Sequence, residues 1–146
     1  MKRLAYLIQR LKSLESEIFD AARKTLEENK EIILDMNSED QLFEKGINRE
    51  GVEIASFAPY SPVTIQIKRE KGQPTNRVTL RDEGDFHYSF FIEFTDDGFE
   101  IKASDWKARN LVANYGETIL GLTNENFRDL AVNYVAPEIL KILKTI

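Results

Sequence analysis

The feature that most constrains this chain is the apolar stripe along its first 28 residues. Apolar side chains recur there at steps of three and four, at Leu4, Leu7, Ile8, Leu11, Leu14, Ile18, Ala22 and Leu26. Charged residues fall mostly on the other side, so the spacing predicts one amphipathic helix over residues 1–28. Such a helix is long for a chain of 146 residues. Its stripe must pack on its own domain or on another subunit.

The length and composition fit one globular domain over residues 1–146. Domains commonly have roughly 100–150 residues, and this chain has 146, with 42% hydrophobic and 31% charged residues. It contains no cysteine, which excludes disulfide frameworks, thiolate zinc sites and a cysteine nucleophile.

Two partner classes are disfavoured by the sequence. Gln9, Arg10 and Lys12 interrupt the first apolar residues, so we expect no signal peptide, and no stretch approaches the ~20 apolar residues that cross a bilayer. We therefore expect no membrane partner. The net charge of -5 argues against non-specific nucleic-acid binding by the whole surface, because phosphate contacts need clustered cations.

The sequence predicts the secondary structure of the middle of the chain only in part. Residues 31–36 could extend the first helix or form a short strand, and Val52-Glu53-Ile54 alternates like a short strand. Ser61 before Pro62 is typical of a helix start and predicts a helix to about Glu70. A polar loop follows at residues 71–77.

The clearest local pattern is a hairpin. Aromatic and apolar residues alternate over residues 86–94 and again over 99–103, and Asp96-Asp97-Gly98 between them favours a tight turn. One face of the hairpin is aromatic and must be covered. The C-terminal third returns to helical spacing at 106–114 and after Thr123, and Pro137 should kink that last helix or begin a new one. We expect an α+β fold with a long N-terminal helix, a small antiparallel sheet and a C-terminal helix packed on it.

Residues suited to catalysis or metal binding do not converge in the sequence. The single histidine, His87, is expected within the hairpin strand, on the face opposite Phe86 and Tyr88. The acidic residues Asp82, Glu83 and Asp85 flank a glycine and are interpreted as solvated turn residues. We expect no enzyme, no catalytic residue, no cofactor and no metal site.

A basic segment offers the best site for a charged partner. It contains Lys68, Arg69, Lys71, Arg77 and Arg81 around the polar loop. No aromatic side chains interleave with them to stack bases. The segment is interpreted as a solvated loop, and an acidic protein or a nucleic acid bound at residues 68–81 stays open as an alternative.

Residues 60–135 resemble a known pattern. Tyr60–Thr64 precedes Lys68, Val78–Phe86 enters the strand with Ser89 behind it, and Tyr115–Thr123 leads to the last helix. This order resembles the virion-morphogenesis and tail-completion (head–tail joining) proteins of tailed phages and prophages. The resemblance implies a non-enzymatic structural subunit, made in the bacterial host cytoplasm and incorporated into the virion at the head–tail junction or tail.

That role predicts a homo-oligomer that also contacts other virion proteins of the neck or tail. The candidate interface residues are Leu4, Leu7, Leu11, Lys68, Arg69, Lys71, Arg77, Tyr115, Gly116, Leu120 and Gly121. A different hypothesis is a monomeric, host-directed binding module or adaptor carried by a mobile element.

Overall fold

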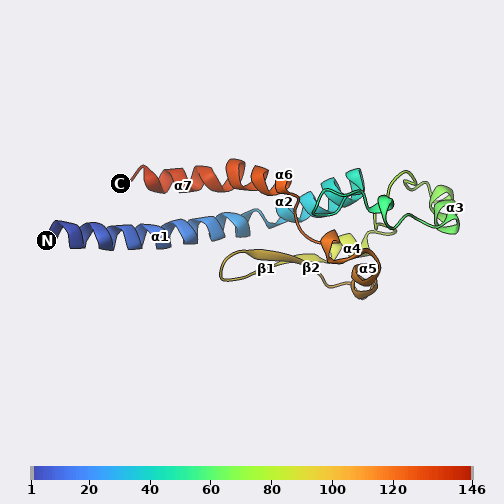
Figure 1. The fold of residues 1–146 in the computed structure, drawn as a ribbon, viewed down its shortest axis with the longest axis horizontal. Coiled ribbons are helices and arrows are strands. Elements are labelled where there is room, and N and C mark those ends of the chain that lie inside the picture. The colour runs from blue at the N-terminus through green and yellow to red at the C-terminus, as the bar shows by residue number, and fades with distance from the viewer. Residues whose placement is uncertain (1, 146) are drawn as a thin grey trace. The chain divides into compact units, whose positions relative to one another are not determined.

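The computed structural model describes residues 2–145 (Figure 1). Contacts between residues divide the chain into two compact units, where the sequence predicts one domain. Unit 1 joins the two ends of the chain, residues 1–30 and 127–146, and unit 2 comprises Glu31–Asn126. Both α-helices and an antiparallel sheet are present, so the α+β class is confirmed.

Unit 1 is a pair of antiparallel helices. The predicted N-terminal helix is confirmed as α1, Lys2–Glu28. The second helix of the pair begins within α6 (Asn124–Asp129), whose first residues belong to unit 2, and continues through the π-helical segment η4 (Leu130–Val135) and α7 (Ala136–Leu143). Pro137 lies in the first turn of α7, directly after the π-helical segment η4.

The C-terminal helix packs along α1. Both η4 and α7 contact α1 within unit 1. The two helices share the helical period, so their apolar side chains can interdigitate along the contact. The predicted packing of the C-terminal helix on the sheet would join the two units and stays a prediction.

The first helical part of unit 2 fills the segment that the sequence left open. α2 (Lys30–Asp35) continues without a break into the π-helical segment η1 (Met36–Lys45), which ends at the left-handed Gly46. The short strand expected at Val52–Ile54 is reduced to a single bridge between Ile47 and Glu53, followed by the 3-10 turn η2, Ile54–Ser56.

The second helical part matches its prediction. Helix α3 spans Pro62–Glu70, and the Ser61 hydroxyl accepts a hydrogen bond from the Thr64 N–H at 3.2 Å. This is the N-cap that the Ser-Pro pair predicts.

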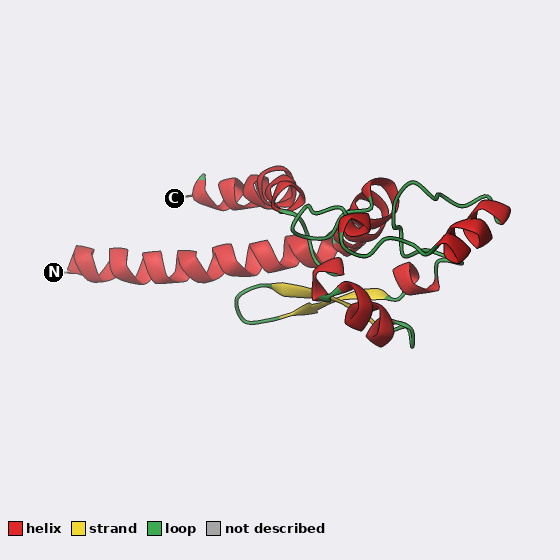
Figure 2. Cartoon of the chain, turned by 45° about the vertical axis from the view of Figure 1, so that its right-hand side comes forward, coloured by secondary structure: helices red, strands yellow, loops and turns green. Residues whose placement is uncertain are grey.

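The hairpin is present but shorter than expected (Figure 2). Strand β1 (Phe90–Phe94) pairs antiparallel with β2 (Phe99–Ala103), with Phe90 opposite Ala103 and Phe94 opposite Phe99. Residues Asp85–Tyr88 form the helical turn α4 instead of extending the strand. Gly84 causes the difference, because its left-handed backbone (φ 96°) turns the chain and its carbonyl accepts the Tyr88 N–H at 2.9 Å.

Unit 2 has its own core. Its buried apolar side chains are Ile33, Met36, Leu42, Ile54, Val78, Leu80, Phe86, Phe90, Ile101, Ala108 and Ile119. Phe86 of α4 and Phe90 of β1 are buried and meet edge to face at 4.9 Å between ring centroids. The predicted aromatic face is covered only in part, because Tyr88 on the helical turn α4 is 85% exposed. Helix α5 (Ala108–Tyr115) and the 3-10 turn η3 (Glu117–Ile119) complete the unit. Within residues 2–145, no helix is long and apolar enough to cross a membrane.

Candidate functional site

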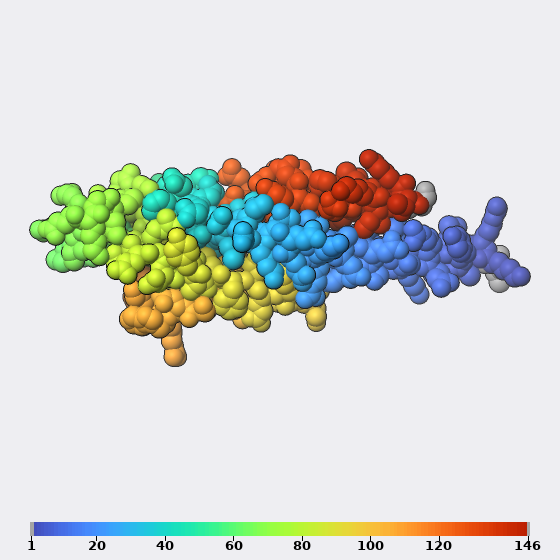
Figure 3. Space-filling model, turned by 180° about the vertical axis from the view of Figure 1, so that it is seen from behind, coloured from blue at the N-terminus to red at the C-terminus, as the bar shows by residue number. Residues whose placement is uncertain are grey.

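The first part of α1, residues Lys2–Ser13, leaves its apolar side uncovered, and we call this segment the overhang. Leu4, Leu7 and Leu11 are 60%, 55% and 63% exposed. Figure 3 shows the blue beginning of α1 continuing past the red end of the C-terminal helix, both within unit 1. The structure thus places these three predicted interface residues together on one uncovered helix face.

The rest of the same stripe is covered by the chain itself. Leu14 is buried, Ile18 is half-buried, and Thr25 is buried with its hydroxyl donating to the Ala21 carbonyl at 2.8 Å. The apolar pattern is therefore continuous along α1, but its side chains are exposed before Leu14 and mostly covered from Leu14 onward. A contiguous exposed apolar stripe of this kind marks an interaction surface.

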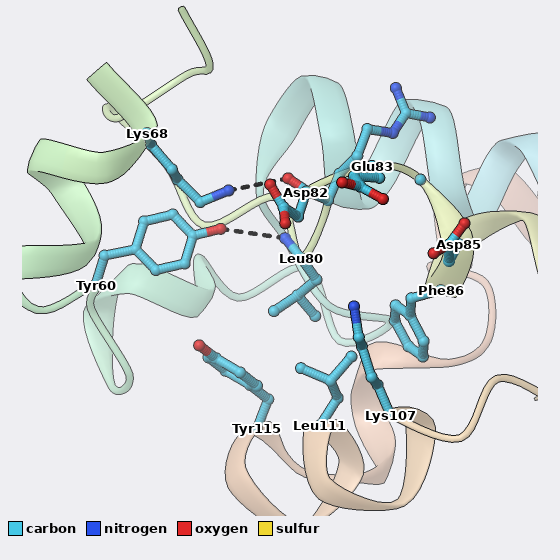
Figure 4. Close-up of a pocket in the computed structure, with 12 residues that line it drawn as sticks. Tyr60, Lys68, Leu80, Asp82, Glu83, Asp85, Phe86, Lys107, Leu111 and Tyr115 are labelled. Atoms are coloured by element: carbon cyan, nitrogen blue, oxygen red, sulfur yellow. Dashed lines mark hydrogen bonds between the residues drawn. The ribbon is translucent and has the colours of Figure 1, made fainter. Parts of the chain in front are cut away.

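A cavity in unit 2 gathers the three segments that carry the phage resemblance (Figure 4). It has a volume of about 180 Å³. Its lining residues are Tyr60, Lys68, Leu80, Arg81, Asp82, Glu83, Gly84, Asp85, Phe86, Lys107, Leu111 and Tyr115. Small-molecule sites usually enclose about 300–1,000 Å³. This cavity is therefore smaller than a usual small-molecule site.

The Tyr60 hydroxyl organises one wall of the cavity. It accepts hydrogen bonds from the backbone N–H groups of Thr79 at 3.0 Å and Leu80 at 3.3 Å. Leu80 has a left-handed backbone (φ 55°), which is unfavourable for a residue with a branched side chain. The two bonds to Tyr60 help hold this turn, and the Leu80 side chain becomes part of the cavity wall.

Lys68 is buried beside the cavity and is committed to internal contacts. Its side chain is 7% exposed. Its ammonium donates to the Arg81 carbonyl at 2.9 Å and to the Gln73 side chain at 3.4 Å, and it lies 5.0 Å from the centre of the Tyr60 ring. A buried ammonium needs such partners, so Lys68 positions the 79–82 segment.

Most of the remaining basic segment is also engaged within unit 2. Lys71 pairs with Asp82 at 2.8 Å, and Arg77 donates to the Phe43 carbonyl at 2.6 Å. Arg81 lies over the Phe43 ring at 4.2 Å and pairs with Glu39. Arg69 projects from α3 as an exposed residue. These contacts reduce the cationic surface that residues 68–81 offer to phosphates.

Tyr115 and the loop after it are held from within the unit. Tyr115 lines the cavity, where burial, and then Tyr60 nearby, raise the pKa of its hydroxyl. Gly116 is exposed and Leu120 half-buried. Gly121 has φ 124°, and a side chain there would meet Arg49 at 2.8 Å. Of these four predicted interface residues, Tyr115 is the one at the cavity.

Sequence reasoning missed the side chains that clamp this loop. Asn37 donates to the Ile119 carbonyl at 3.0 Å and accepts from the Gly121 N–H at 2.8 Å. Gln41, one turn later, donates to the Gly121 carbonyl at 2.8 Å and accepts from the Thr123 N–H at 2.9 Å. Both amides are fully buried. The sequence did contain a signal, because Asn37 and Gln41 are four residues apart and would lie on the same face of a helix. The helix at residues 30–45 was not predicted, so this signal was missed.

His87 lies on the helical turn α4, which corrects its expected place within the hairpin strand, and its side chain is buried. Its Nε2 is 2.9 Å from the Thr79 carbonyl oxygen, which can only accept, so Nε2 carries the proton. Burial, and then the Arg81 charge, lower the pKa of His87 to about 4. The neutral imidazole therefore packs between Phe86 and Phe90 as part of the core.

The acidic residues expected at turns are exposed. Asp82 accepts from Lys71 and Gln73, and these hydrogen bonds lower the pKa of its carboxyl group. Glu83 and Asp85 lie on the cavity rim. Among residues 2–145, no three histidine, aspartate or glutamate side chains are grouped closely enough to hold a metal ion.

The site therefore consists of two surfaces, one on each unit. The overhang offers an uncovered apolar helix face, and the unit 2 cavity offers a shallow recess with an apolar floor and a charged rim. Both are suited to contacts between proteins. Comparison with known protein families, with curated proteins and with solved structures finds no match for this chain.

Proposed function

We propose that this chain is a structural subunit of a tailed-phage or prophage particle. It acts at the head–tail junction or in the tail, by self-assembly and by docking to neighbouring virion proteins. The observation that carries the proposal is the uncovered stripe of the overhang, with Leu4, Leu7 and Leu11 each more than half exposed. Removing such apolar area from water yields about 25 cal/mol per Å², so a subunit with this surface gains free energy by assembling.

The unit 2 cavity supports the same proposal. The resemblance to tail-completion proteins rests on the segments around Tyr60, Leu80–Phe86 and Tyr115, which are far apart along the chain. All three contribute side chains to one cavity. The three segments of the sequence pattern therefore form one structural feature. A cavity of this size fits a side chain of an adjoining virion protein.

The test is particle assembly in the bacterium that carries the gene. Deleting the gene is expected to abolish infectious particles and to leave heads and tails unjoined in electron micrographs. A wild-type copy supplied in trans is expected to restore them. Complete, infectious particles made without this chain would refute the proposal.

A second measurement separates the virion role from a host-directed adaptor. Purified particles are expected to contain this chain at a fixed stoichiometry by mass spectrometry. An adaptor would remain in the host lysate and would be absent from the particles, and that result would also count against the proposal.

A further inference from the structure

The stripe of α1 repeats every seven residues. Leu4, Leu11, Ile18 and Thr25 occupy one position of this repeat, and Leu7, Leu14 and Ala21 occupy the position three residues later. This is the a/d spacing of a two-helix coiled coil, in which a seam of side chains faces a partner helix. The chain's own C-terminal helix fills the seam from Leu14 onward, and the overhang leaves the first layers open.

We infer that the overhang pairs, antiparallel, with the overhang of a second copy of this chain. In this register Leu7 of one copy packs against Leu11 of the second copy, and Leu4 lies at the edge of the interface, next to the buried Leu14 of the second copy. The same contacts recur in reverse, so the interface is isologous and closes at two subunits. The inference rests on the proposed assembly role of the overhang and names its partner.

Ile8 adds apolar area to the same interface. It lies beside the seam on the side toward Leu4 and Leu11 and is 46% exposed. In the antiparallel register Ile8 faces Ile8 of the second copy at the twofold axis. All four large aliphatic side chains of the overhang are then covered.

Charge determines that the partner helix runs antiparallel. The overhang carries Lys2, Arg3, Arg10 and Lys12 and no acidic residue, although the chain has a net charge of -5. The acidic residues of α1 begin at Glu15 and Glu17, just past the overhang. Antiparallel pairing brings Lys2 and Arg3 of one copy close to Glu15 and Glu17 of the other. Parallel pairing would instead place Lys2 and Arg3 beside the same two cationic residues of the second copy.

In the antiparallel register, Arg10 would be the one cationic residue of the overhang that lies close to the same residue of the second copy. Its guanidinium already pairs with Glu17 of the same helix at 3.1 Å. This internal partner offsets its charge, so the central contact does not oppose the pairing.

The helix pair of unit 1 favours the same direction. α7 runs antiparallel to α1, with both chain ends on the same side of unit 1 (Figure 1). A second α1 that also runs antiparallel therefore continues in line where α7 ends. Its basic first turn then meets the C-terminal end of α7, where helix carbonyls carry a partial negative charge. A parallel partner would have to diverge at Leu14.

The overhang is about 18 Å long at 1.5 Å per residue, so the dimer is expected to be concentration-dependent. Light scattering on the purified chain should show a monomer–dimer equilibrium. Replacing Leu4, Leu7 and Leu11 with serine is expected to leave a monomer. The matched control Val63→Ser, at an apolar side chain of α3 that is 68% exposed, is expected to keep the dimer.

The cysteine-free chain allows the direction to be tested by cross-linking. A mixture of Leu7→Cys and Leu11→Cys copies should form a mixed disulfide under mild oxidation. Leu4→Cys alone should cross-link poorly, because antiparallel pairing keeps Leu4 far from Leu4 of the second copy. Efficient Leu4→Cys homodimers with no mixed 7–11 product would overturn the antiparallel arrangement.

The outcomes separate this inference from the proposed function. A wild-type chain that stays monomeric up to about 100 μM would overturn the pairing of two copies. If the triple serine variant still failed to complete particles in the host, the assembly role would stand and the overhang would contact another virion protein. If that variant made complete particles, the overhang would have no part in assembly.

Discussion

Unit 2 encloses its own core, whereas unit 1 does not. In unit 2, side chains such as Ile33, Leu42 and Ile119 are fully buried. Among the described residues of unit 1, the buried side chains are Leu14, Thr25 and Leu130. Its exposed large hydrophobic residues are Leu4, Tyr6, Leu7, Ile8, Leu11, Phe19, Phe127, Val132, Leu140 and Leu143.

The difference follows from geometry. Two helices touch along one line, so each shows most of its circumference to water, while helices and a hairpin wrapped together can close around side chains. Unit 2 is therefore expected to be stable as it stands. The stability of unit 1 is expected to increase if a partner covers the overhang.

The largest effect is expected from Leu42→Ala in unit 2. Leu42 is fully buried, and truncating such a leucine costs about 2–5 kcal/mol of unfolding free energy because a cavity remains. Denaturant unfolding followed by tryptophan fluorescence measures it. A loss of less than about 1 kcal/mol would mean that unit 2 lacks the close packing assigned to it.

The next effect is a dependence of unit 2 stability on pH. The pKa of His87 is about 4 in the folded chain and about 6.5 when unfolded. Between these values the unfolded chain binds more protons, so the unfolding free energy falls as the pH drops from about 6.5 to 4, by up to about 3 kcal/mol. Below pH 4 this contribution is constant.

The variant His87→Gln isolates that contribution. Glutamine keeps a donor for the Thr79 carbonyl but does not titrate. Urea unfolding from pH 7 to 4 should therefore show a shallower decline for the variant than for the wild type. Parallel curves for the two proteins would contradict the buried, neutral state of His87.

The third prediction concerns the buried amide clamp. Gln41→Ala removes the partners of the Gly121 carbonyl and the Thr123 N–H. Leaving such buried groups unpaired costs about 1–3 kcal/mol. Hydrogen exchange should rise at residues 119–123 and stay unchanged in α3. Unchanged protection at Gly121 and Thr123 would contradict the clamp.

The smallest effect is expected from Leu11→Ala in unit 1. It is the same substitution as Leu42→Ala, but Leu11 is 63% exposed, so the unfolding free energy of the dilute monomer should change by less than about 0.5 kcal/mol. Self-association at higher concentration should weaken. A loss comparable to that of Leu42→Ala would show that the chain itself covers the overhang and would remove the contrast between the units.

Features that depend on neighbouring residues were predictable. The Ser61-Pro62 pair predicted α3, because the cap and the first turn are made by adjacent residues. The turn Asp96-Asp97-Gly98 predicted the β1–β2 hairpin for the same reason. The extent of β1 was overestimated, since the alternation from Phe86 could not reveal that the left-handed Gly84 starts a helical turn. The candidate residues Leu4, Leu7 and Leu11 lie on one helix face, as their spacing predicts, and are exposed; their role at an interface stays a prediction.

Features that depend on distant residues were not predictable. The burial of Lys68 depends on the Arg81 carbonyl, and the role of Gln41 depends on a loop about 80 residues away. Neither contact produces a periodic pattern of residues in the sequence from which it could be predicted. The sequence therefore led us to interpret the basic segment as a solvated loop. It also gave no indication of the contacts that residues 30–45 make.

The sequence by itself determined the α+β class, the long amphipathic α1 and the continuity of its apolar stripe, because helical period and turn chemistry are local properties. Only the tertiary structure decided which part of that stripe is used. The C-terminal helix returns along α1, so one part of the stripe is buried within unit 1 and the first part, with Leu4, Leu7 and Leu11, remains exposed. The contact between the two helices sets this division, and that contact exists only in the folded chain.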